Sequence, residues 1–129
     1  MSVRKERPMW QYFNPNPKSS RVGDCSVRAI SKAMNMSWED AYIVICLKGF
    51  IKADMPSSNS VWGEYLAEHG FSKMVPEPCT TVRNFCKKYP TGLYVCSLTG
   101  HVVTIADGHY YDTWDSGDET VLYAWRKDR

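Results

Sequence analysis

Residues 93–114 of the chain are LYVCSLTGHVVTIADGHYYDTW, and this stretch decides the fold that we expect. β-Branched and aromatic residues dominate it, and polar turn-forming pairs separate its apolar runs, as is typical of neighbouring strands. Asp107-Gly108 indicates a two-residue hairpin, because a type I′ turn needs a positive φ at both positions. The sequence therefore predicts four strands, over residues 93–98, 102–106, 110–114 and 121–125.

The half of the chain before residue 93 has helical rather than alternating apolar spacing. Asp24, Ser37, Ser58 or Asn59, and Thr80 or Thr81 are polar residues that cap the starts of four expected helices. The first helix covers about Cys25 to Met34, and the third ends at His69-Gly70. Prolines at 8, 15 and 17 exclude a helix from residues 1–23 and predict an extended lead-in. We expect an α+β fold in one domain, residues 1–129, with N-terminal helices packed on a C-terminal antiparallel sheet of about four strands.

Composition favours a globular protein with free thiols. The 129 residues are 43% hydrophobic and carry a net charge of +2, which points to no particular partner. The five cysteines are odd in number and form no CxxC motif, and we identify no signal peptide, so we expect a reducing cytoplasm. The longest apolar run, around Ala41 to Leu47, is too short to span a membrane.

Two other kinds of site are disfavoured. Cys79, Cys86, Cys96 and His101 match no zinc-site spacing, so we expect no metal and no cofactor. The basic residues at 4, 5 and 7 precede Trp10, Tyr12 and Phe13, a pattern that could contact nucleic acid. We interpret it instead as a solvated terminus followed by a packing strand, and we expect no nucleic-acid partner.

Cys25 and His101 form the most informative pair in the sequence. Cys25 lies in the run GDCSVRAIS, at the predicted start of a helix, where the partial positive charge of the helix end favours a thiolate. His101 opens an apolar strand in the run GHVVTI. A thiol and an imidazole brought together by the fold would make a cysteine nucleophile with its base.

A third group is needed to orient the imidazole, and the hairpin proposes Asp112. If Asp107-Gly108 is the turn, Val103 faces Asp112 and His101 faces Trp114, so all four side chains share one face of the sheet. With a loop one residue longer, His101 would face Asp115 instead. We favour Asp112.

A carbonyl substrate also needs donors for its developing oxyanion. The backbone N–H of Cys25 is one candidate. A side-chain donor is expected from the segment before the cysteine, which offers Asn14, Asn16, Ser19 and Arg21. The sequence does not choose among these four.

The segments Asp24-Cys25, Gly100-His101-Val102-Val103 and Asp112-Thr113-Trp114 resemble the papain-like cysteine peptidases. The resemblance is closest to the compact bacterial and phage branch that includes bacteriocin-processing peptidases. It implies Cys25 as nucleophile, His101 as base and Asp112 as orienting residue, with Trp114 shielding the site from water. The family places a glutamine donor six residues before the nucleophile, where this chain has Ser19; Asn16 is the further candidate for that role.

These features together predict a cytoplasmic thiol hydrolase that cleaves peptide or isopeptide bonds through an acyl-enzyme on Cys25. A transferase or deamidase could use the same intermediate, since the fold does not fix which acceptor attacks. The alternative is a non-catalytic phage or bacterial protein of the same fold that sequesters or modifies a host factor. The sequence names neither the substrate nor the oligomeric state.

Overall fold

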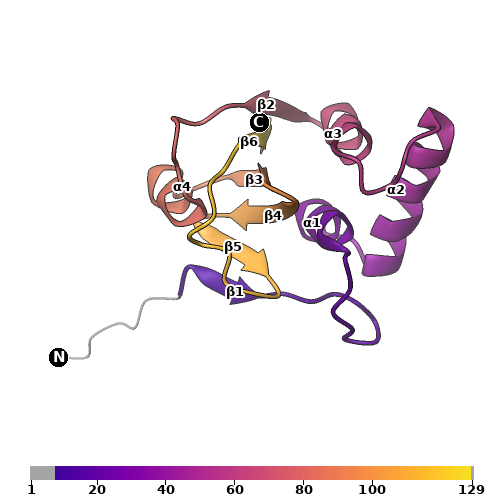
Figure 1. The fold of residues 1–129 in the computed structure, drawn as a ribbon, viewed down its shortest axis with the longest axis horizontal. Coiled ribbons are helices and arrows are strands. Elements are labelled where there is room, and N and C mark those ends of the chain that lie inside the picture. Colours follow the sequence, from indigo (N-terminus) through magenta and orange to yellow (C-terminus); the bar gives the residue numbers. More distant parts are fainter. Residues whose placement is uncertain (1–7, 129) are drawn as a thin grey trace.

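The computed structural model describes residues 8–128, so the basic residues at 4, 5 and 7 lie outside the described residues. The described residues form an α+β fold (Figure 1). Its helices are α1 (Cys25–Met34), α2 (Trp38–Lys52), α3 (Asn59–Glu68) and α4 (Val82–Lys88). Its strands are β1 (Trp10–Tyr12), β2 (Phe71–Met74), β3 (Leu93–Leu98), β4 (His101–Ala106), β5 (His109–Asp112) and β6 (Tyr123–Lys127).

The strands make one sheet in the order β1-β5-β4-β3-β6-β2. The expectation of about four antiparallel strands is wrong in two respects, because the sheet has six strands and β1 pairs with β5 in parallel. The two strands outside the predicted four-stranded sheet, β1 and β2, are short and lie at the two edges of the sheet. β1 falls within the expected extended lead-in, at the residues interpreted as a packing strand.

The central hairpin has the predicted register. Ile105 pairs with Tyr110 and Thr104 with Tyr111, as a two-residue loop requires. Asp107 and Gly108 have φ values of 49° and 78°, the two positive values that a type I′ turn needs. This register brings the end of β5 beside the start of β4.

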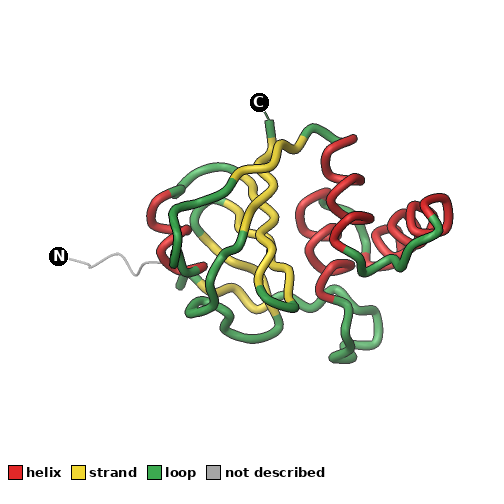
Figure 2. Tube along the Cα trace, turned by 45° about the horizontal axis from the view of Figure 1, so that its top comes forward, coloured by secondary structure: helices red, strands yellow, loops and turns green. Residues whose placement is uncertain are grey.

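The sheet separates two hydrophobic clusters, with α1 to α3 on one side and α4 on the other (Figure 2). Alternation along β3 divides its side chains between the clusters: Val95 packs with the helices α1 to α3, and Cys96 packs with α4. Trp62 of α3 and Phe85 of α4 are completely buried, one in each cluster. A single sheet thus supports two separate apolar cores.

Helix starts agree with the predicted caps. The side chain of Ser37 accepts a hydrogen bond from the N–H of Asp40, and that of Thr81 accepts one from Asn84. α1 is fastened to the sheet by the buried hydroxyl of Thr104, which donates to the carbonyl of Ala29 at 2.8 Å. Across residues 8–128, no helix has both the length and the apolar character that crossing a bilayer requires.

Candidate active site

The ends of three elements meet at one place in the fold. Cys25 is the first residue of α1, His101 is the first residue of β4, and Asp112 is the last residue of β5. Gly100 precedes His101 with a φ of 64°, a conformation that lets the β3–β4 turn end directly at the histidine. The three residues predicted as a catalytic set are therefore brought together by the fold.

His101 stands between the other two residues. Its Nε2 lies 2.7 Å from Oδ2 of Asp112, and its ring also shares a hydrogen bond with the Cys25 thiol. With Nε2 engaged by the carboxylate, Nδ1 is the ring nitrogen left for the sulfur. The predicted alternative, Asp115, instead accepts hydrogen bonds from the hydroxyl of Tyr110 and the N–H of Gly117.

The surroundings of Cys25 favour its thiolate. Burial alone would raise the pKa of this thiol, but the hydrogen bond and charge of His101 outweigh burial. The backbone N–H of Val102 and the positive charge of Arg28 add to the effect, and the pKa of Cys25 lies below its usual value. The thiol is therefore prepared for nucleophilic attack.

His101 is shifted in the opposite direction. Burial would lower the pKa of the imidazole, but its hydrogen bonds to Asp112 and Cys25 raise that pKa to about 9. The opposite shifts favour a thiolate beside an imidazolium over a neutral thiol beside a neutral imidazole. The two groups titrate as a coupled unit.

Asp112 is held by four donors and is 1% exposed. Its Oδ2 accepts from His101 and from the hydroxyl of Ser116 at 2.7 Å each, and its Oδ1 accepts from the N–H of Thr113 at 2.8 Å and from Arg28 at 3.1 Å. Burial would raise the pKa of this carboxyl, but the hydrogen bonds from His101 and Ser116 lower it below its usual value. Asp112 is a fixed anion.

Arg28 is a further member of the site. An arginine one turn into a helix is by default a surface charge, although it could also anchor an acidic partner or Asp24; it is 6% exposed and bridges Asp112 and Asp24. Asp24 is the N-cap of α1 by position, as predicted, but its side chain makes no capping hydrogen bond. The carboxylate instead accepts from Arg28 and from Nε1 of Trp38 at 2.9 Å. Two carboxylates share one guanidinium, and the remaining negative charge favours a protonated His101.

Ser116 is an unpredicted partner of Asp112. It is completely buried and follows Asp112 by four residues in a polar loop. For Arg28, the sequence did contain a sign of its ion pair, because Asp24 and Arg28 are four residues apart and therefore adjacent on a helix. We find no comparable signal for Ser116, because its loop looks like ordinary exposed chain.

A cleft of about 440 Å³ opens over Cys25. Only some of the residues predicted to lie around the nucleophile line this cleft. Trp114 lines it, with the indole ring 5.0 Å from the imidazole of His101. Among the four candidate oxyanion donors, Arg21 lines the cleft and the other three do not. Asn16 accepts a hydrogen bond from the N–H of Lys18, and Ser19 is exposed, with a φ of 55°.

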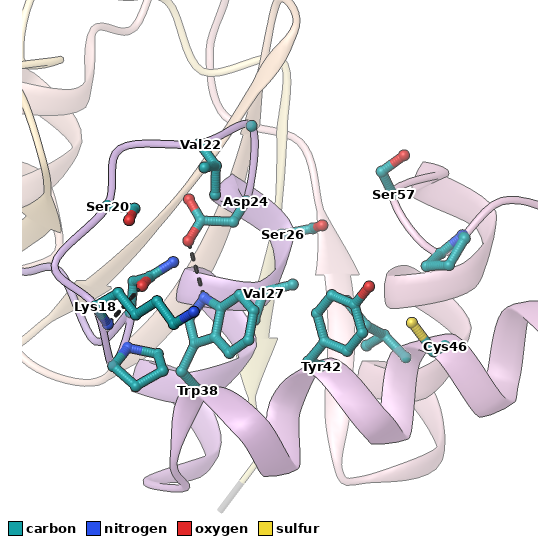
Figure 3. Close-up of a pocket in the computed structure, with 15 residues that line it drawn as sticks. Lys18, Ser20, Val22, Asp24, Ser26, Val27, Trp38, Tyr42, Cys46 and Ser57 are labelled. Carbon is teal, nitrogen blue, oxygen red and sulfur yellow. Dashed lines mark hydrogen bonds between the residues drawn. The ribbon is translucent and has the colours of Figure 1, made fainter.

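A larger pocket of about 570 Å³ lies beside this cleft and shares Val22 and Gly23 with it (Figure 3). Its walls are mainly apolar. Trp38 and Tyr42 of α2 stack there with ring centroids 5.0 Å apart, and Val27 also faces the space. This size and lining are typical of sites that take small apolar groups.

The described residues contain no group of three or more His, Cys, Asp or Glu side chains that could hold a metal ion. All five cysteines are unpaired. No protein-family model, curated protein or solved structure matches the chain.

Proposed function

We propose that this protein is a papain-like thiol hydrolase that cleaves peptide or isopeptide bonds through an acyl-enzyme on Cys25. The observation that carries the proposal is the hydrogen-bonded series Cys25–His101–Asp112, with the pKa of the thiol lowered and that of the imidazole raised to about 9. A cysteine that served only for packing would have its pKa raised by burial.

Acylation begins from the thiolate–imidazolium pair. The sulfur of Cys25 attacks the carbonyl carbon, and the carbonyl electrons move to oxygen in a tetrahedral intermediate. The intermediate collapses, the C–N bond breaks, and the imidazolium of His101 gives its proton to the leaving amine. The products of this half are a thioester on Cys25, a free amine and a neutral His101.

Deacylation reverses the proton movement. Neutral His101 takes a proton from water as the water oxygen attacks the thioester carbon. Collapse breaks the C–S bond and releases a carboxylic acid, which leaves the thiolate and the imidazolium restored. Asp112 stays ionised in both halves, where it orients the ring and stabilises its positive charge.

The second pocket supports a polypeptide substrate with a bulky apolar side chain next to the scissile bond. Because Val22 and Gly23 border both spaces, a chain bound at Cys25 can place a neighbouring side chain against Trp38 and Tyr42. A Phe at position 46 would fill this pocket from α2. We expect Cys46→Phe to reduce cleavage beside apolar residues, while Cys46→Ser keeps it.

The test is cleavage of a complex peptide mixture, with new chain ends identified by mass spectrometry. We expect the native protein to generate new ends near bulky apolar residues, and Cys25→Ala to generate none. Circular dichroism of the Cys25→Ala variant controls for loss of fold. Identical peptide ends from the two proteins would reject the hydrolase proposal.

One observation favours a second candidate, a protein of this fold that sequesters or modifies a host factor. Ile43, Leu47, Phe50 and Ile51 of α2 are 57–84% exposed and recur at i, i+4, i+7 and i+8, so they form one apolar stripe. Such a stripe suits docking of another protein. A folded native protein whose Cys25 proves inert to peptides and to thiol reagents would favour this candidate over the hydrolase.

A further inference from the structure

Arg21 holds a position in the cleft that the reaction as described leaves unused. It precedes Cys25 by four residues and lines the same cleft as Cys25, His101 and Trp114. Its side chain crosses from the N-terminal segment to the loop after β5, where Nη2 donates to the carbonyl of Thr113. This hydrogen bond anchors the guanidinium to the far side of the cleft that Cys25 also lines.

The anchor of Arg21 is itself rigid. Thr113 is 7% exposed, and its N–H donates to Oδ1 of Asp112 at 2.8 Å. A guanidinium has five N–H donors, so the bond to Thr113 leaves others available. Asn16 and Ser19, the two candidates that the family resemblance singles out, line no part of this cleft.

We propose that Arg21 is a catalytic residue that donates to the oxyanion of the tetrahedral intermediate, together with the backbone N–H of Cys25. Cys25 is the first residue of α1, where the helix offers its N–H no carbonyl partner. A charged donor forms stronger hydrogen bonds to an anion than a neutral amide does. This inference rests on the proposed acyl-enzyme reaction and identifies the side chain that stabilises its transition state.

Two thiol reagents separate this role from activation of the thiol. p-Nitrophenyl acetate acetylates the sulfur by addition to a carbonyl, which forms an oxyanion and releases p-nitrophenolate. Iodoacetamide reacts by displacement of iodide at a saturated carbon, which forms no oxyanion. A group that acts only on the oxyanion accelerates the first reaction and not the second.

We expect Arg21→Ala to slow acetylation of Cys25 by about 10²-fold, the size seen when one oxyanion donor is removed. Alkylation by iodoacetamide should stay within about twofold, since no oxyanion forms in that step. Arg21→Gln, which keeps a neutral donor, should recover part of the acetylation rate. Lys87→Ala is the control, because Lys87 is an exposed cation of α4 that lines neither the cleft nor the larger pocket; both of its rates should equal those of the native protein.

The outcomes are distinguishable. Unchanged acetylation in both Arg21 variants would overturn the role of Arg21 and leave the hydrolase proposal intact. An equal fall in acetylation and alkylation would also overturn it, because Arg21 would then act on the thiolate. If Cys25 of the native protein reacts with neither reagent faster than the exposed Cys79, the proposed function itself fails.

Discussion

The two sides of the sheet hold cysteines in opposite environments. Cys86 and Cys96 lie in the apolar cluster on the α4 side, where burial raises the pKa of Cys86 to about 12 and that of Cys96 far above its usual value. Cys25 packs against the cluster on the other side, and burial also acts to raise its pKa, yet that pKa is lowered. Burial is common to all three thiols, so the partners decide their chemistry.

Those partners are available only where elements end. Cys86 and Cys96 lie within α4 and β3, where backbone groups are used in the helix and the sheet. Cys25, His101 and Asp112 each occupy a terminal residue of an element. A helix start and two strand ends supply unpaired backbone donors and room for polar side chains, which a continuous apolar face does not.

The largest effect is expected from Asp112→Asn, which removes the anion that holds His101 protonated. Acyl transfer should fall by about 10³–10⁴-fold, since a neutral amide neither orients the ring correctly nor supports its positive charge. The rate of alkylation of Cys25, plotted against pH, should have its inflection at a higher pH than in the native protein, because the imidazolium that stabilises the thiolate is lost.

Asp115→Asn is the matched control, since this exposed carboxylate lies close in sequence and contacts Tyr110 rather than His101. It should leave both the rate and the inflection unchanged. Equal effects of the two substitutions would contradict the assignment of Asp112. Rescue is expected from Asp112→Glu only to the extent that the longer side chain still reaches Nε2.

The second comparison is direct labelling of the thiols at neutral pH. Burial raises the pKa of Cys86 to about 12, whereas the pKa of Cys25 is lowered from its usual value, so the thiolate fractions differ by about 10³-fold or more. The more basic thiolate is the better nucleophile, which reduces the expected ratio of alkylation rates to at least about 30-fold. Iodoacetamide followed by peptide mass spectrometry measures the ratio; after denaturation in urea, the two rates should become similar.

A smaller change in the rate of hydrolysis is expected when the pH is varied. The active pair needs a thiolate and an imidazolium, so hydrolysis should fall as pH drops through the lowered pKa of the thiol. It should also fall as pH rises through about 9, where His101 loses its proton. Alkylation by iodoacetamide needs only the thiolate and should persist above pH 9. A hydrolysis rate that keeps rising beyond pH 10 would contradict an acid role for His101.

The sequence predicted the features of the fold and the site that depend on residues close together in the chain. The turn at Asp107-Gly108 set the register of the β4–β5 hairpin, and that register placed Asp112 rather than Asp115 near His101. The polar caps Ser37 and Thr81 marked two helix starts correctly. In each case residues close in sequence determine the geometry.

What the sequence did not predict depends on contacts between distant segments. β1 is three residues long, and its aromatic residues indicated a packing strand, but no local pattern predicts its parallel pairing with a strand about 100 residues later. Arg28 looks like a surface residue until Asp112, 84 residues away, joins Asp24 in neutralising its charge. Arg21 could not be chosen over Asn16 or Ser19, because only the path of the N-terminal segment shows which side chain reaches the cleft.

The smallest expected effect lies on the α4 side of the sheet. Cys86→Ala should reduce the free energy of unfolding by about 1 kcal/mol, since it removes a small buried side chain from a packed cluster. Exposed Cys79→Ala is the control and should change stability by no more than about 0.5 kcal/mol. Chemical denaturation measures both, and alkylation of Cys25 should proceed at the native rate in each. If Cys86→Ala slowed that alkylation, the two sides of the sheet would be energetically coupled, and the state of Cys25 could no longer be ascribed to its immediate partners alone.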